Sequence, residues 1–245
     1  MNRQAIQLFE VAYPTVARDA ALSSPSSNKQ LVLRSLSAYN STGSAIDIGL
    51  GVRHSTSAWK LYQVNASYTD LTSSVQAGSA VSILPTTNNY GFIVQAKDIF
   101  GCLSLTISQA ETGSPTYSYQ YWNGSTWATL NLRNTPVYTA TGSIAIAFAP
   151  PIDWAQGNGS VVSDLAWGAG YCIRVRGTTA PSTAVQITAF AVSHFVAFRN
   201  VGSKAALSLS FSERPLLLEI GEAVQAYFAT AANANSVEGS YQVNG

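Results

Sequence analysis

The sequence predicts an all-β protein built from tandem antiparallel β-sandwich modules of the Ig-like or jelly-roll kind. Apolar and polar residues alternate with a period of two in many short segments, as they do in half-buried strands. Gly, Pro and Asn separate these segments, and helical periodicity is nearly absent. Hydrophobic residues make up 47% of the 245-residue chain, which is enough for a substantial core.

The expected strands are short and spread along the whole chain. Clusters of turn-forming residues bound them, and strands at this spacing are typical of sandwiches and barrels. They are the segments 31–39, 45–52, 58–64, 100–107, 144–148, 171–175, 185–192, 205–211 and 223–228.

Differences in residue composition along the chain predict an arm and three modules. The arm ends at a linker-like Pro-Ser-Ser-Asn-Lys stretch, and the middle module is richer in Tyr and Trp. Segment 199–210 resembles segment 39–50, since each has a polar turn followed by a strand of small and aliphatic residues. The expected divisions are an N-terminal arm at 1–28, a β-sandwich module at 29–101, an aromatic-rich β-sandwich module at 102–193 and a C-terminal β module at 194–245.

The arm carries apolar residues in an alternating pattern at Ile6, Leu8, Val11 and Tyr13. This pattern predicts a strand, and two pairings are open to it. The arm either pairs within its own chain or adds a strand to the sheet of a neighbouring subunit, which would tie subunits together.

The sequence Tyr-Trp-Asn-Gly-Ser-Thr-Trp at 121–127 predicts a β-hairpin. Asn-Gly between alternating segments favours a two-residue type I′ turn, which would place Trp122 opposite Ser125. Side chains alternate between faces along a strand, so Trp122 and Trp127 share the more polar face and the tyrosines share the core face. The tryptophan pair is either covered by a neighbouring loop or open to a partner protein or a flat sugar.

Charge is scarce in this chain. Only 10% of the residues are charged and the net charge is +1, so Ser, Thr, Asn, Gln and Gly supply most of the polarity. A weakly hydrated surface of this kind fits a protein that contacts other subunits, and a homo-oligomer is expected. No basic field exists to steer a nucleic acid or an acidic membrane.

The chain shows neither a signal peptide nor an uninterrupted apolar run long enough to span a membrane. Synthesis in the cytoplasm is therefore expected. Cys102 and Cys172 are either buried thiols or one bridge, and the missing signal favours thiols.

The motifs of common enzyme and cofactor sites are missing, so we expect no enzymatic activity, no metal and no cofactor. His54 and His194 are not spaced as metal ligands. Asp153 and Asp164 would serve a glycosidase only if the fold made them face each other. A turn-stabilising role is the simpler interpretation of Asp153.

Two arginines, Arg174 and Arg176, alternate onto one face of the expected strand at 171–175 and its continuation. Such a pair can meet an acidic partner or lie on a solvated face. With Trp122 and Trp127, these arginines are the candidate contact residues of the middle module.

Two stretches resemble structural proteins of tailed bacteriophages. The run RPLLLEIGEAVQAYFATAANANSVEGSYQV at 214–243 resembles the closing hairpins of small β-sandwich modules in phage head and tail accessory proteins. The combination YQYWNGSTWATL, GSIAIAFAPPIDWA and GYCIRVRG resembles a module of phage baseplate, fibre and other virion-surface proteins. Together they cover roughly residues 115–245.

The resemblance implies a β-sandwich protein of the virion whose Tyr and Trp residues are largely framework. The expected function is that of a non-enzymatic structural protein that decorates the capsid or forms part of the neck or tail. Its partners would be other virion proteins, namely capsid, neck or tail subunits. The alternative is a carbohydrate-binding or receptor-binding appendage that holds a glycan with Trp122 and Trp127.

Overall fold

The computed structural model describes residues 7–12, 17–23, 30–157, 169–211, 216–229 and 235–244. Strands dominate the described chain, and the strand pairs whose registers are described run antiparallel. The described part also holds one short α-helix, α1 (Thr72–Gln76), and one 3-10 turn, Thr56–Ala58. The prediction of an all-β protein with antiparallel sheets is confirmed.

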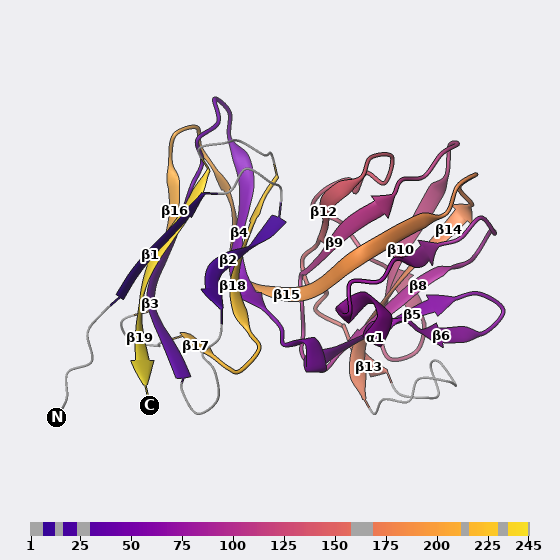
Figure 1. The fold of residues 1–245 in the computed structure, drawn as a ribbon, viewed down its shortest axis with the longest axis horizontal. Coiled ribbons are helices and arrows are strands. Elements are labelled where there is room, and N and C mark those ends of the chain that lie inside the picture. The colour runs from indigo at the N-terminus through magenta and orange to yellow at the C-terminus, as the bar shows by residue number, and fades with distance from the viewer. Residues whose placement is uncertain are drawn as a thin grey trace. The chain divides into compact units, whose positions relative to one another are not determined.

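The chain forms two compact units, and the first combines both ends of the sequence, 1–55 and 193–245. One of its layers has the strand order β1-β19-β3-β16, with β17 also beside β3, and the other has the order β15-β4-β18-β2 (Figure 1). The strands of this unit are β1 (Gln7–Ala12), β2 (Ala17–Ser23), β3 (Gln30–Tyr39), β4 (Ile46–Arg53), the end of β15 (Val185–Val201), β16 (Ala206–Ser210), β17 (Leu216–Leu218), β18 (Ala223–Phe228) and β19 (Ser236–Asn244).

The core of the first unit lies between these layers. Alternate residues of β4, β16 and β18 point inward, as the period-two pattern requires. Strand β3 breaks the alternation, because its register against β19 shifts near Arg34 and lets both Leu33 and Leu36 reach the core. The largest fully buried side chains of this core are Leu33, Leu36, Ile48, Leu50 and Phe228.

The N-terminal arm supplies two strands that pair within the chain. Strand β1 pairs with β19, which places Leu8 opposite Ser240 and Val11 opposite Val237, and strand β2 pairs with β18. Ile6 and Tyr13 lie outside the described residues. In-chain pairing is one of the two arrangements that the sequence left open, and exchange of the arm between subunits stays a prediction.

The second unit comprises residues 56–192 and is also a pair of sheets. One sheet has the order β11-β10-β14-β8-β5-β6 with β13 beside β14, and the facing sheet includes β12, β9, β7 and the first part of β15. The further strands are β5 (Trp59–Val64), β6 (Tyr68–Asp70), β7 (Val81–Leu84), β8 (Gly91–Ala96), β9 (Cys102–Gln109), β10 (Thr116–Trp122), β11 (Trp127–Thr129), β12 (Gly142–Ala147), β13 (Gln156–Gly157) and β14 (Gly170–Thr179).

Aromatic side chains fill much of the core of the second unit. The Trp59 ring lies 5.2 Å from that of Phe190, measured between centroids, and the Phe100 ring lies 4.8 Å from that of Trp154. These rings meet at steep angles, which is the favoured geometry for aromatic pairs. The aromatic-rich texture of the middle of the chain is therefore largely core packing.

The two units differ from the expected modules. The boundary at Val192/Ser193 lies one residue from the expected division at 193/194, whereas the expected division at 101/102 falls inside the second unit. Strands on both sides of that point, β8 and β9, contribute to one core. The similar segments 39–50 and 199–210 lie in the first unit, where Tyr39 pairs with Ala206 and Ile46 with Val201.

Both cysteines are buried free thiols. Burial raises the pKa of Cys102 and of Cys172 to about 12, and the thiolate is the reactive form. We expect the native protein to leave both thiols unmodified by Ellman's reagent at pH 8, while denatured protein reacts with two equivalents. Rapid reaction of one thiol in the native state would contradict the burial described.

Candidate interaction face

The hairpin at 121–127 has a longer loop than the sequence predicts. Trp122 pairs with Trp127 rather than lying opposite Ser125, so four residues form the loop. The Asn123 side chain accepts hydrogen bonds from the backbone N–H groups of Ser125 and Thr126, at 3.1 and 2.8 Å. This Asx-type turn replaces the predicted type I′ turn, and Gly124 alone in the loop has positive φ, at 98°.

The predicted faces survive this change, because the register moves by two residues and the side-chain period is two. Trp122 and Trp127 lie on the face away from the core, and Gln120 and Ser118 follow on the same side of β10. Strand β14 pairs with β10 so that Arg174 lies opposite Gln120 and Arg176 opposite Ser118. We call this surface the tryptophan–arginine face; it comprises Ser118, Gln120, Trp122, Trp127, Arg174 and Arg176.

The structure thus brings together all four contact residues that the sequence proposes for the middle module. The guanidinium carbon of Arg174 lies 4.4 Å from the centroid of the Trp127 ring. Its Nε and Nη2 donate to Gln120 Oε1 at 3.1 and 2.7 Å. The centroids of the Trp122 and Trp127 rings are 5.8 Å apart and the ring planes meet at 67°, so the two rings do not form one flat platform.

An apolar cluster supports the face. Tyr62, Ile93 and Cys172 are buried on the same side of the sheet, and both tryptophans pack against them. Burial, followed by the charge of Asp70, raises the pKa of Tyr62 to about 12, so its phenol stays neutral. The arginines therefore stand beside an apolar surface, where their charges are poorly screened.

Positive charge on this face is not balanced by a neighbouring carboxylate in the described part of the chain. Burial, followed by the adjacent Arg176, lowers the pKa of Arg174 to about 10. The described residues offer Arg176 Nε, Ser118 Oγ and Tyr62 Oη no hydrogen-bond partner, although all three atoms are buried. Buried polar groups are normally paired, so this face has unused capacity for a polar ligand.

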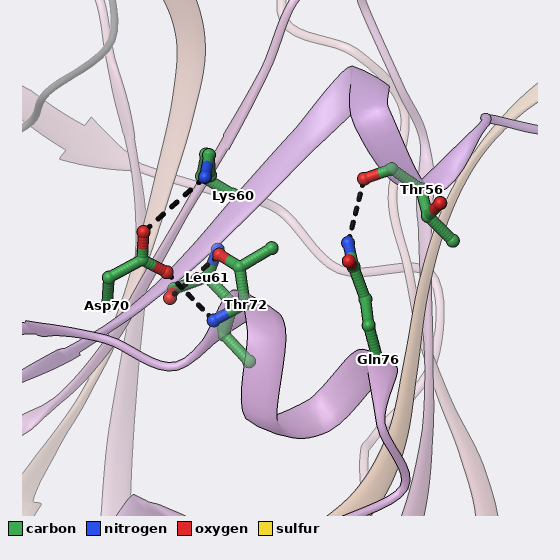
Figure 2. A network of polar contacts seen from close by, with 6 residues as sticks. All are labelled: Thr56, Lys60, Leu61, Asp70, Thr72 and Gln76. Carbon is green, nitrogen blue, oxygen red and sulfur yellow. Dashed lines mark hydrogen bonds and ion pairs between the residues drawn. The ribbon is translucent and has the colours of Figure 1, made fainter.

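Asp70 is the one acidic residue in the described strands of this sheet, and its carboxylate is engaged in a network of its own (Figure 2). Its carboxylate accepts from the Thr72 backbone N–H at 2.8 Å and lies 3.5 Å from Lys60 Nζ. Burial would raise the pKa of Asp70, but the Thr72 hydrogen bonds and Lys60 outweigh it and lower that pKa. Thr72 Oγ1 also accepts a hydrogen bond from the Leu61 N–H. Gln76 Nε2 donates to Thr56 O at 2.8 Å, which joins α1 to the 3-10 turn.

A hollow of about 540 Å³ opens on the second unit, beside Tyr117 and Tyr119 on the core side of β10. The Tyr117 hydroxyl donates to the carboxylate of Glu111, and the hydroxyls of Tyr119 and Tyr138 are 3.2 Å apart. Asn134 also lines the hollow, but its amide is bonded to backbone atoms of the 145–147 segment. No local spacing in the sequence indicates this site, because its residues come from three separate stretches, at 111, 115–119 and 132–139.

The tyrosines of this hollow make the second unit sensitive to alkali. Burial and the charge of Glu111 raise the pKa of Tyr119 to about 12, although its hydrogen bond with Tyr138 lowers it. The folded state then binds the phenol proton more tightly than the unfolded chain, whose pKa is near 10, so the free energy of unfolding should fall as pH rises above 10. Each such phenol contributes a slope of at most about 1.4 kcal/mol per pH unit.

Urea midpoints between pH 8 and 11, followed by Trp fluorescence, check this expectation. All five tryptophans of the sequence lie between 56 and 192, so the signal reports the second unit. A Tyr119→Phe variant lacks one of the titrating groups and should show a shallower decline. An equal decline in both proteins would contradict the assignment.

The remaining candidate residues do not assemble into a reaction centre. His54 and His194, which the sequence separates widely, lie with their rings 5.2 Å apart, but no group of three metal-ligating residues exists in the described chain. Asp153 accepts a hydrogen bond from the Tyr121 hydroxyl at 2.7 Å. Asp164 lies outside the described residues.

No family model matches the sequence, and the searches found no similar curated protein or solved structure. Among the described residues, no helix is long and apolar enough to cross a membrane. The function of the protein is therefore inferred from its fold, its tryptophan–arginine face and the resemblance of its sequence to phage structural proteins.

Proposed function

We propose that the protein is a non-enzymatic structural component of a tailed-phage virion, held in place by subunit contacts. In this role it decorates the capsid or forms part of the neck or tail. The observation that carries the proposal is the gathering of Trp122, Trp127, Arg174 and Arg176 on one accessible sheet face. Tryptophan and arginine are the residue types most enriched at the energetic centres of protein interfaces.

Two further features support a contact role. The chain has few charges, so contacts through its surface would depend more on apolar burial than on ion pairs that salt screens. The sequence patterns shared with phage head, tail and fibre modules point to the same kind of assembly. The protein would be made in the host cytoplasm and act in the virion.

The hollow beside β10 favours carbohydrate binding as the second candidate function. Aromatic rings, the Glu111 carboxylate and polar side chains around 540 Å³ are suited to a saccharide. The Trp122/Trp127 pair suits one less well, because Arg174 covers a face of Trp127. A glycan array probed with wild type, Glu111→Gln and Arg174→Gln distinguishes the two sites. Loss of glycan binding in Glu111→Gln but not in Arg174→Gln would place the glycan in the hollow.

Quantitative mass spectrometry of purified virus particles from the source tests the virion proposal. We expect a fixed copy number, in the hundreds for a capsid decoration protein and in the handful to few dozen for a neck, tail or fibre component. A non-structural protein encoded by the same virus serves as the contamination control. Absence of the protein from particles would overturn the proposal.

A further inference from the structure

The second unit carries, close to its tryptophan–arginine face, a surface of opposite character. Two adjoining loops expose isoleucines, Ile99 at 44% and Ile152 at 106% of full exposure. Each isoleucine is next to an exposed aspartate, Asp98 or Asp153. We call these four residues the aspartate–isoleucine tip.

The two loops of the tip form one surface. Phe100 and Trp154, which directly follow the tip residues of each loop, pack with ring centroids 4.8 Å apart. Exposed apolar side chains grouped in this way typically mark a contact site. Lys97 lies beside Asp98, so the tip has two carboxylates and one ammonium group at its edge.

The tip and the face have complementary chemistry. The face offers two guanidinium groups, a buried Arg176 Nε to which the described residues give no partner, and an apolar margin formed by the tryptophans. Guanidinium groups bind carboxylates through paired hydrogen bonds, and isoleucine side chains can cover indole rings. Tyr62, only 3% exposed, adds a buried hydroxyl that also lacks a partner among the described residues.

The tip and the face also lie next to each other. Ala155, just past the tip, donates its backbone N–H to Trp122 O at 3.1 Å, and the Trp154 indole donates to Cys172 O at 3.1 Å. Adjacent complementary surfaces on one unit suit a two-fold pairing, in which the tip of each copy covers the face of the other. Such an interface closes on itself and contains the contact between tip and face twice.

We infer that two copies of this chain associate through the second unit, with Asp98 and Asp153 of one copy meeting Arg174 and Arg176 of the other. The inference deepens the proposed function by naming the partner of the tryptophan–arginine face. It does not depend on where in a virion the dimer would be placed.

Sedimentation equilibrium of the full chain over a range of concentrations and salt tests this inference. Wild type should dimerise, and more weakly at high salt because part of the contact is ionic. Arg174→Gln with Arg176→Gln, and separately Ile152→Asp, should each weaken dimerisation at least tenfold. Arg133→Gln, which removes an exposed arginine elsewhere in the same unit, should leave it unchanged.

A charge exchange makes the test specific. The double variants Arg174→Asp/Arg176→Asp and Asp98→Arg/Asp153→Arg should each fail to form homodimers. When the two variants are mixed, native mass spectrometry should detect a heterodimer. In one of its two tip–face contacts the charges are reversed on both sides, and in the other both sides keep the wild-type charges, so each contact still joins opposite charges. Far-ultraviolet circular dichroism confirms that each variant is folded.

Monomeric wild type at every soluble concentration would overturn the inference, as would dimerisation that the face and tip variants leave unchanged. Neither result changes the copy number expected in virus particles, so the virion proposal is tested independently of the dimer. Conversely, a dimer with these properties from a protein absent from particles would overturn only the virion proposal.

Discussion

Replacing Gly91 by alanine is expected to unfold the second unit or to destabilise it by more than about 3 kcal/mol, above the usual range for overpacking a core. Gly91 begins β8 opposite Arg176, and a Cβ atom there would lie 1.9 Å from the carbonyl oxygen of Val175. That oxygen belongs to the backbone of β14 and cannot turn aside as a side chain can. The two strands would have to separate, and their pairing lies at the centre of the sheet.

Urea unfolding followed by Trp fluorescence measures this effect, because every tryptophan lies in the range of the second unit. Gly177→Ala is the matched control in the same unit, since a Cβ atom at Gly177 would lie 3.5 Å from its nearest neighbour, Thr179 O, which is an ordinary van der Waals contact. Its stability should change by less than about 1 kcal/mol. Equal stability of Gly91→Ala and wild type would show that β8 and β14 do not approach as closely as described.

Asn40→Ala is expected to cost the first unit about 3 kcal/mol, because several buried polar groups lose their partner at once. The Asn40 side chain is fully buried. Its Nδ2 donates to the carbonyl oxygens of Ser44, Val201 and Gly202 at 2.9 to 3.0 Å, and its Oδ1 accepts from the Thr42 backbone N–H at 2.9 Å. This one amide joins the turn after β3 to the turn after β15.

Differential scanning calorimetry measures the loss, since the first unit contains no tryptophan. Asn65→Ala is the comparison: that asparagine also organises a turn, where it accepts from the Ser67 N–H at 2.9 Å, but it is only partly buried. Its replacement should cost about 1 kcal/mol or less. Similar losses at the two positions would contradict the special role of Asn40.

Local patterns in the sequence predicted the class of fold and the composition of the faces. Alternation along 117–122 places the tyrosines inward and Trp122 outward, and the structure has this arrangement. Alternation cannot set the hairpin register, however, because shifts of two residues preserve it. The register depends on Asn123, whose side chain captures two backbone N–H groups.

The organisation into units depends on contacts between distant parts of the chain, which composition does not reveal. Arg199 pairs with Ile48 across 151 positions, so the stretch before Ser55 completes a sandwich with the C-terminal strands. The 17-residue strand β15 runs through the expected division at 193/194. The change in residue composition at that point predicts a boundary between modules. It does not reveal that one strand continues without interruption across the boundary.

The candidate sites show the same limit. The pairing of Arg174 with Gln120 follows from β10 and β14 being neighbours, although more than 50 residues separate them. Alternation alone placed the two arginines on one face, while their place beside Trp127 required the sheet order. Tyr138 and Glu111 meet in the hollow from irregular segments without a recognisable spacing.

Oxidative footprinting of Trp122 and Trp127 tests the central claim, that the tryptophan–arginine face is a contact surface in an assembled virion. Hydroxyl-radical labelling is compared between dilute, monomeric protein and the same protein within purified particles. We expect both indoles to be labelled in the monomer and protected several-fold in particles, while Tyr39, exposed on the first unit, serves as an internal reference. Equal labelling of both tryptophans in the two samples would contradict the account.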